Sequence, residues 1–205
     1  MIVAGTNALN LKTERDLKRS TIYMTNARKQ LCLDAPIVGT VIDLVPVKGE
    51  HLAHFVSFFQ DERVMYYYLP TPLKCYSLSD LQVLIKDWDN GDTDVLLTIE
   101  KDGRPIGLMN VDNVDLGNRN AEIGIALTVP ELRGHGLAKN AITLLMSHVL
   151  QAERLHRLYA RVVVGNTASR LLFESAGFRY EGTLKEALMR PEAYLDMDVF
   201  GKVGF

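Results

Sequence analysis

The chain has 205 residues, of which 47% are hydrophobic and 23% are charged, and its formal net charge is −2. This length suits a single domain with its own core, and the balanced charge argues against the broad basic surface that nucleic-acid binding requires. Cys32 and Cys75 lie far apart, with no spacing typical of a disulfide framework or a zinc site, which favours a reducing, cytoplasmic location.

The N-terminal part of the chain is expected to be an extension, residues 1–38, attached to a main domain of residues 39–205. A charged patch at residues 12–19 precedes an expected amphipathic helix that ends near Leu33. The extension could cover the core or mediate a homodimer, and a charged helix on the surface is the simplest interpretation. No apolar run approaches the length of a membrane span or of a signal-peptide core, so we expect no membrane insertion.

The first elements of the main domain are expected to be a strand and two helices. Residues 39–47 contain a β-branched run that Pro46 ends, which predicts a strand. Residues 50–59 predict a helix. A second helix is expected to begin at Ser77, where Asp80 has the spacing of a capping box, and to end before Asn90.

The middle of the chain is expected to be rich in strands. Residues 95–100 and 105–110 predict a hairpin around the turn at residues 101–104. Residues 112–120 are polar and typical of a turn-rich loop. Residues 121–129 predict the next strand, which Pro130 ends.

The C-terminal part predicts two helices and three strands. Apolar residues recur at three- and four-residue steps from Leu137 to Val149, which indicates a helix with one face on a sheet. Residues 158–164 alternate as a strand, and a second helix is expected between Asn166 as N-cap and Gly177 as the residue that closes it. Two final strands are expected at residues 178–184 and 194–200. The whole order of helices and strands predicts an α+β or mixed α/β layer fold.

A glycine-containing loop joins the strand before Pro130 to the helix that follows. A helix start carries free backbone N–H groups and the positive end of the helix dipole, so the loop suits an anion such as a phosphate. Gly134 and Gly136 allow a ligand to approach the backbone closely. The motifs of P-loop and dinucleotide-binding folds are absent here.

Four motifs together resemble the RimJ/RimL-like branch of the GNAT family of acyl-CoA-dependent N-acetyltransferases. The loop fits Arg/Gln-x-x-Gly-x-Gly/Ala, and the next helix carries Asn-x-x-Ser at Asn166 and ends with Gly177-Phe178. The strand at residues 121–127 and the segment 194–196 are also similar to that branch. The resemblance covers roughly residues 40–200 and implies a mixed, mostly antiparallel central sheet flanked by helices, with splayed fourth and fifth strands.

The resemblance implies that acetyl-CoA is the co-substrate and that no metal takes part. The pantetheine arm is expected to pair with a strand end, and the pyrophosphate is expected to lie on the loop amides. The implied cofactor-binding residues are Leu127, Thr128, Val129, Arg133, Gly134, His135, Gly136, Leu137, Ala138, Asn166 and Phe173. His51 and His54 share a helix face, but they lack a third ligand and are interpreted as surface residues.

Transfer of an acetyl group to an amine needs a proton acceptor, an oxyanion donor and a proton for the departing thiolate. Glu122 is the candidate for the proton acceptor, although a solvent-facing carboxylate is an equal alternative. A backbone N–H near Leu127 is expected to meet the oxyanion. Phe173 stands where many GNAT enzymes carry a tyrosine, so Ser169 becomes the candidate hydroxyl donor, with water or a purely structural Ser169 as alternatives.

The expected acceptor is a primary amine, most simply the N-terminal α-amine of a protein or peptide. A small amine such as a polyamine, an amino sugar or an antibiotic is the alternative, and acidic residues could form an entrance for such a cation. These acidic residues are Asp61, Glu62, Asp112 and Asp115. The three tyrosines at residues 66–68 are expected either to line the acceptor pocket or to pack in the core. A non-catalytic acyl-CoA-binding module is the alternative from another class of protein.

Overall fold

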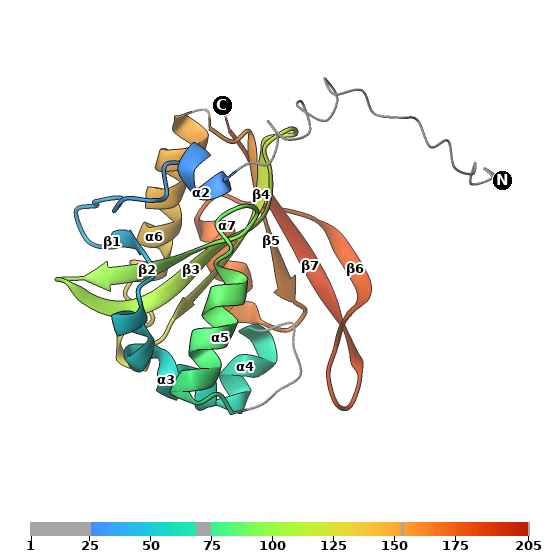
Figure 1. Cartoon of the computed structure of the whole chain (residues 1–205). Helices are drawn as coiled ribbons and strands as arrows, with labels where there is room; N and C mark the ends of the chain where they lie inside the picture. Colours follow the sequence, from blue (N-terminus) through green and yellow to red (C-terminus); the bar gives the residue numbers. More distant parts are fainter. Residues whose placement is uncertain (1–25, 69–74, 153, 205) are drawn as a thin grey trace, which may run out of the picture.

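The computed structural model describes residues 26–68, 75–152 and 154–204. These residues form one seven-stranded sheet in the order β1-β2-β3-β4-β5-β7-β6. All neighbouring strands are antiparallel except β4 and β5, which are parallel. Figure 1 shows α3, α4 and α5 grouped together and apart from α6, with the β6–β7 hairpin at the far end of the sheet from β1.

The strands and helices have the following bounds. The strands are β1 (Asp43–Pro46), β2 (Val95–Lys101), β3 (Arg104–Asp115), β4 (Asn120–Leu127), β5 (Arg157–Val163), β6 (Arg179–Met189) and β7 (Tyr194–Val203). The α-helices are α2 (Ala27–Gln30), α3 (Leu52–Gln60), α4 (Glu62–Tyr68), α5 (Leu78–Trp88), α6 (Leu137–Met146) and α7 (Thr167–Ser175). Short 3-10 turns, Gly49–His51 and Pro130–Leu132, precede α3 and follow β4, and a π-helical turn, Ser147–Gln151, continues α6.

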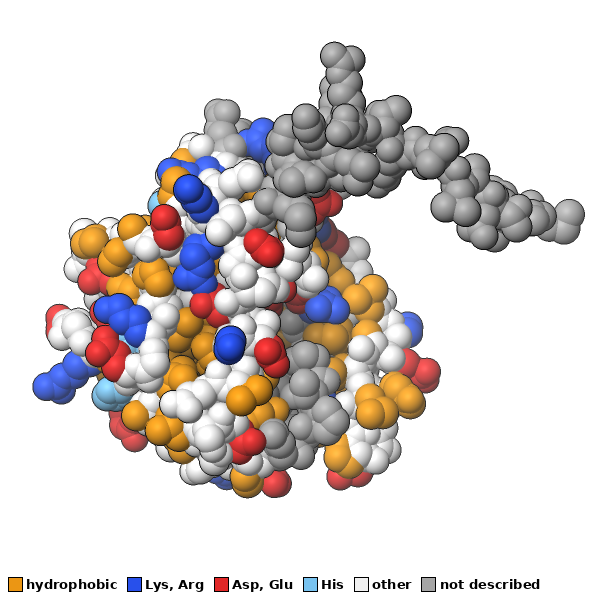
Figure 2. Space-filling model, in the orientation of Figure 1, with side chains coloured by type: hydrophobic (Ala, Val, Ile, Leu, Met, Phe, Trp, Pro, Cys, Tyr) orange, Lys and Arg blue, Asp and Glu red, His pale blue; other side chains and the backbone are white. Residues whose placement is uncertain are grey.

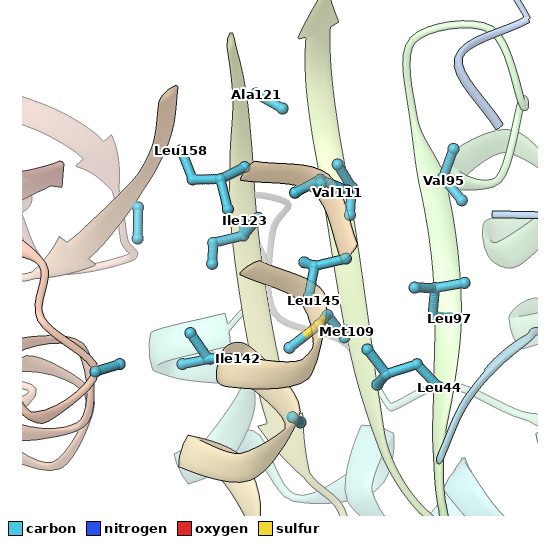
Figure 3. Packing of buried hydrophobic residues seen from close by; sticks show 14 of the residues in the cluster. Leu44, Val95, Leu97, Met109, Val111, Ala121, Ile123, Ile142, Leu145 and Leu158 are labelled. Atoms are coloured by element: carbon cyan, nitrogen blue, oxygen red, sulfur yellow. The ribbon is translucent and has the colours of Figure 1, made fainter. Parts of the chain in front are cut away.

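Two clusters of buried hydrophobic residues lie on opposite faces of the sheet. Ile142 and Leu145 of α6 lie over the face that carries alternate residues of β2, β3 and β4 (Figure 3). The other face carries Leu96 and Leu108, which pack with the apolar side chains of α3 and α5. Because side chains alternate along a strand, residues 108, 110 and 112 of β3 and the even-numbered residues of β4 lie on the α3–α5 face. Ile106 and Val114, at the register irregularities near the two ends of β3, pack with the other cluster. This alternation determines which side chains of β3 and β4 lie together on one face of the sheet.

Strands β4 and β5 pair only at their beginnings. Their register joins residues 120–122 of β4 with residues 157–159 of β5, whereas β4 continues to Leu127 and β5 to Val163. The fourth and fifth strands therefore splay apart, as the resemblance implied. Among the described residues, no strand covers the edge toward β5 along the rest of β4.

The secondary-structure predictions are confirmed for the hairpin of β2 and β3, for α5 and for the glycine-closed helix α7. Ser77 and Asp80 form the expected capping box. Gly177 has the left-handed φ of 86° and closes α7. The expected helix at residues 50–59 is present as a 3-10 turn followed by α3.

Three sequence predictions were wrong in extent, one of them the strand expected at residues 178–184, which runs to Met189 as β6. The first strand was expected over residues 39–47, but β1 is shorter because the chain forms a loop between Ile37 and Leu44, which exchange backbone hydrogen bonds of 2.8 and 3.0 Å. The polar segment 112–120 was expected to be a loop, but β3 runs to Asp115 and β4 begins at Asn120. Pairing with the neighbouring strand outweighs the polar composition there.

Residues 26–37 pack into the same core as the main domain. Ala27, Leu31 and Leu33 are fully buried. The helix expected to end near Leu33 corresponds to α2, which Asn26 caps and which ends at Gln30. The charged patch at residues 12–19 lies outside the described residues. In the part of the chain that the structure describes, no helix is both long and apolar enough to cross a membrane. Figure 2 shows acidic and basic side chains interspersed on the face in view.

Candidate active site

A cavity of about 990 Å³ passes the place where β4 and β5 separate. On one side it is lined by the start of α6 and by α7, and on the other side by α4 and α5. The uncovered part of β4, residues 123–127, lies between these two sides. Two ligands can therefore meet at β4 when they enter from opposite faces of the sheet.

The glycine loop opens α6 as predicted. Gly134 and Gly136 have φ angles of 79° and 77°, in the left-handed region, and a Cβ atom on either would meet nothing within 4 Å. Gly136 is the N-cap of α6. Because glycine has no side chain that could accept from the first amides of the helix, these amides are available to an anion. The His135 side chain is exposed, whereas Leu137 is buried and contributes its backbone to this start.

Arg133 does not extend into the cavity as a free charge. Its Nε and Nη2 atoms donate to the carbonyl oxygen of Leu127 at 3.2 and 2.9 Å. The guanidinium thus links the glycine loop to the last residue of β4. An anion on the loop would still lie near this positive charge.

The uncovered edge of β4 carries alternate backbone groups. Thr128 donates its N–H to Ile106 on the β3 side at 2.9 Å. Because the N–H and C=O of successive strand residues point to opposite sides, Leu127 and Ile125 present theirs to the gap beside β5. The Leu127 carbonyl already accepts from Arg133, so Leu127 offers its N–H. Val129 lies beyond β4 and is partly buried. An extended ligand arm can pair with this edge as an added strand would.

Helix α7 brings three of the predicted residues to the cavity. Asn166 caps the helix, because its Oδ1 accepts the N–H of Ser169 at 3.2 Å. Ser169 is half-buried and lines the cavity. Phe173 is buried and packs edge-on against Phe178, with ring centroids 5.2 Å apart. A phenyl ring at this position supplies shape and no proton.

Glu122, the predicted proton acceptor, lies where β4 and β5 separate. One carboxylate oxygen accepts from Arg161 Nε at 2.8 Å, and the other accepts from Asn113 Nδ2 at 3.2 Å. Its side chain is only 12% exposed, so it is no solvent-facing carboxylate. The hydrogen bonds to Glu122 raise the pKa of Arg161. Both oxygens of Glu122 are thus already engaged.

Asp112 was expected at an acidic entrance, but it lies on the wall of the cavity. Asp112 faces Glu122 across the β3–β4 pair, and Asn110 faces Gly124 one step further. Burial raises the pKa of Asp112 to about 7, and its hydrogen bond from Asn110 offsets this only in part. Asn110 itself is 6% exposed and was missed. Its signal was a polar residue at an inward position of an apolar strand.

The remaining acidic and tyrosine residues divide between the cavity and the surface. Of the four acidic residues expected at an entrance, all of which the structure describes, only Asp112 lines the cavity. Tyr67 and Tyr68 line it, and Tyr68 also packs against the aromatic cluster of α3. Tyr66 instead accepts on its backbone oxygen from the buried guanidinium of Arg190, at 2.9 and 2.8 Å.

His51 was interpreted as a surface residue, which is wrong. It is 3% exposed, and its Nδ1 lies 2.7 Å from the Thr98 hydroxyl oxygen. Burial lowers the pKa of His51, and the negative charge of Glu100 opposes this. His54 is exposed. Within the described residues, no group of three or more His, Cys, Asp or Glu side chains is arranged to hold a metal ion.

The chain is similar to known acetyltransferases in sequence. A family model described as "Acetyltransferase (GNAT) domain" matches residues 42–179. A ribosomal-protein-serine acetyltransferase of Escherichia coli (strain K12) is 29% identical over 108 residues, which are 53% of this chain and 60% of that protein. The putative ribosomal N-acetyltransferase YdaF of Bacillus subtilis (strain 168) is 32% identical over 111 residues, 52% of this chain and 60% of YdaF. The match thus spans about 60% of the length of these two relatives.

Solved structures share the fold. RimL, a ribosomal alpha-N-protein acetyltransferase in complex with coenzyme A, superposes with a TM-score of 0.72 at 19% identity, covering 82% of this chain and 98% of RimL. A spermidine N-acetyltransferase from Vibrio cholerae, in complex with CoA and spermine, gives a TM-score of 0.70 at 22% identity, covering 80% of this chain and 96% of that one.

Proposed function

The chain belongs to the GNAT acetyltransferase family, and from this premise we propose that it moves an acetyl group from acetyl-CoA to the N-terminal α-amine of a protein or peptide. The observation that carries the proposal is the cavity that crosses the sheet at the splay of β4 and β5. It joins an anion-binding helix start on one side to a buried carboxylate on the other. A donor with a pyrophosphate and an acceptor with an ammonium group fit these two ends.

The donor is held by three features of this chain in the proposed complex. The start of α6, residues 133–138, receives the pyrophosphate on its backbone amides. The uncovered edge of β4 pairs with the amide groups of the pantetheine arm, and Leu127 offers its N–H to the thioester oxygen. Asn166 and Phe173 form the α7 side of the channel. Acetyl-CoA supplies the activated acetyl group.

The acceptor nitrogen attacks the thioester carbonyl after it has lost a proton. Two carboxylates, Glu122 and Asp112, lie opposite each other on paired strands near the splay, and either is placed to take this proton. The C–N bond forms, the C–S bond breaks, and the thiolate of coenzyme A takes a proton. Ser169 is the nearest predicted hydroxyl donor for that last step, on the α7 side of the cavity.

The choice of an α-amine rests on chemistry and on relatives. An α-amine has a pKa near 8, so a weak base is sufficient to deprotonate it. The E. coli and B. subtilis relatives carry ribosomal-protein names, which supports this class. A polyamine is the second candidate, because the α4–α5 side of the cavity ends at buried acidic groups that suit a cation. A homodimer and a cytoplasmic location stay predictions.

The test is an acetylation screen with the purified chain and acetyl-CoA. Peptides with free N-termini, the same peptides with blocked N-termini, and polyamines are offered, and free thiol and acetylated products are measured. Acetylation of the free α-amine alone supports the proposal, and acetylation of polyamines alone supports the second candidate. If acetyl-CoA binds but no amine in the panel is acetylated, the chain is a non-catalytic acyl-CoA-binding module.

The cofactor site has a matched pair of glycines for a control. Gly136→Leu is expected to weaken acetyl-CoA binding by about tenfold, equivalent to about 1.4 kcal/mol, because a side chain covers the helix start. Gly103→Leu introduces similar strain, since Gly103 has φ 71° and open space around its Cβ, but it lies in the β2–β3 turn. Equal binding by the two variants would remove the assignment of this loop.

The proposed role of Ser169 on α7 as a proton donor can be tested with one variant. Ser169→Ala is expected to lower turnover while acetyl-CoA affinity stays the same. Ser169 donates its backbone N–H to the helix cap, and this bond survives the change. Unchanged turnover would leave water as the proton source for the thiolate.

A further inference from the structure

Three of the four buried side-chain oxygens that lack a hydrogen-bond partner in the described residues lie in one recess of the cavity. They are Tyr68 Oη, Asn110 Oδ1 and Asp112 Oδ1, and all three residues line the cavity. Buried polar atoms are nearly always hydrogen-bonded, so such a cluster calls for a ligand that satisfies it. The recess is on the α3–α5 side, opposite the glycine loop.

The sheet is built to keep this recess open. Asn110 and Gly124 are partners across β3 and β4, and a Cβ atom on Gly124 would lie 2.4 Å from Asn110 Oδ1. Only glycine there leaves room for the amide, which donates its Nδ2 to Asp112 Oδ2. The other carboxylate oxygen of Asp112 has no partner. The Asn110 amide therefore fixes Asp112 through one oxygen and leaves the other for a ligand.

The chemistry of the recess fits an ammonium group. An ammonium has three N–H donors and no acceptor, and the recess offers two carbonyl-type oxygens and one hydroxyl. Aromatic rings of Tyr68 and Trp88 also line the cavity there, and such rings attract a cation. The carboxylates of Asp112 and Glu122 both line the cavity and would repel an anion.

Resting on the proposed function, we propose that this recess binds the ammonium form of the acceptor and that Asp112, rather than Glu122, takes its proton. Both oxygens of Glu122 are already held by Arg161 and Asn113, whereas Asp112 has a free one. The ammonium R–NH3⁺ and the carboxylate become R–NH2 and the carboxylic acid. The amine nitrogen then bonds to the acetyl carbon and the C–S bond breaks. The second proton, which the nitrogen loses as the amide forms, neutralises the departing thiolate, and Asp112 returns the first proton to solvent.

The electrostatic surroundings of Asp112 suit a proton acceptor near neutral pH. Burial favours the neutral acid, as do the charges of Asp94 and Glu122, whereas the hydrogen bond from Asn110 and the nearby N–H of the Trp88 side chain oppose them. A base whose pKa lies near the working pH is the most effective one. The titratable and charged groups that face Asp112 are Tyr68 on α4, Asp94 before β2, Glu122 on β4, and Tyr159 and Arg161 on β5.

The test compares Asp112→Asn, Glu122→Gln and wild type in kcat and KM against pH, with the best acceptor from the screen. Wild type is expected to lose activity below about pH 7. Asp112→Asn is expected to lose this acid limb and about 100-fold or more in kcat, with the KM for acetyl-CoA unchanged. Asp102→Asn, in the exposed β2–β3 turn, is the control and is expected to match wild type.

A second variant separates proton transfer from structural damage. Asn110→Ala removes the donor that lowers the pKa of Asp112, so the acid limb is expected to move to higher pH. A merely structural role would lower kcat and leave the limb in place. The proposal is overturned if Asp112→Asn keeps the wild-type limb, or if Glu122→Gln alone removes it. A wild-type chain that acetylates no amine overturns the proposed function itself, whatever the variants do.

Discussion

Asp112→Asn is expected to stabilise the protein, and by more at high pH than at low pH. Burial raises the pKa of Asp112 from its ordinary value of 3.8 to about 7 in the folded state. Between these two values the folded state binds more protons than the unfolded state, so the free energy of unfolding of wild type falls as the pH rises. Asparagine does not titrate and avoids this loss.

The magnitude follows from the size of the shift. A shift of one pKa unit corresponds to about 1.4 kcal/mol, so the roughly three units at Asp112 destabilise the folded state by about 4 kcal/mol above pH 8. About 3 kcal/mol of this loss falls between pH 5 and pH 8. The difference in unfolding free energy between Asp112→Asn and wild type is therefore expected to grow by about 3 kcal/mol over this range.

Urea denaturation at pH 5, 6, 7 and 8 measures this difference directly. Any constant effect of the substitution, such as an altered hydrogen bond to Asn110, appears at every pH and cancels. Asp102→Asn is the control, because hydrogen bonding to Lys101 lowers the pKa of Asp102 and its titration ends below this range. A constant difference for Asp112→Asn from pH 5 to 8 would show that the carboxylate is not held in its neutral form.

Two further changes test the packing around the site, both by urea denaturation. Gly124→Ala is expected to lose about 1–3 kcal/mol, because its Cβ would lie 2.4 Å from Asn110 Oδ1, whereas Gly49→Ala, with nothing within 4 Å, is the matched control and is expected to change little. Equal stability of the two variants would refute the close packing at Gly124. Arg190→Lys is expected to lose about 1–3 kcal/mol, because the ammonium cannot reproduce the two hydrogen bonds to the Tyr66 carbonyl; wild-type stability would show that one donor is sufficient.

The elements of the fold with strong local signals could be predicted from the sequence. The capping box at Ser77, the N-cap at Asn166 and the left-handed residue Gly177 are fixed by neighbouring residues, and all three are present. The extents of β1 and β3 were wrong because they depend on pairing with strands far away in the chain. No local pattern distinguishes a polar loop from a polar strand that a neighbour holds in place.

The two halves of the site differ in the same way. The phosphate-binding part of the donor half is a continuous segment of the chain, residues 133–138, so its chemistry follows from the order of its residues. The acceptor half is assembled from β3, β4, α4 and α5, and its key contacts join Asn110 to Gly124 and Asp112 to Glu122 across a strand pair. In the sequence, Asn110 is only a polar residue in an apolar strand, and Gly124 is only a glycine within the next strand. Because only the register of β3 on β4 gives them a common face, the acceptor half follows from the structure.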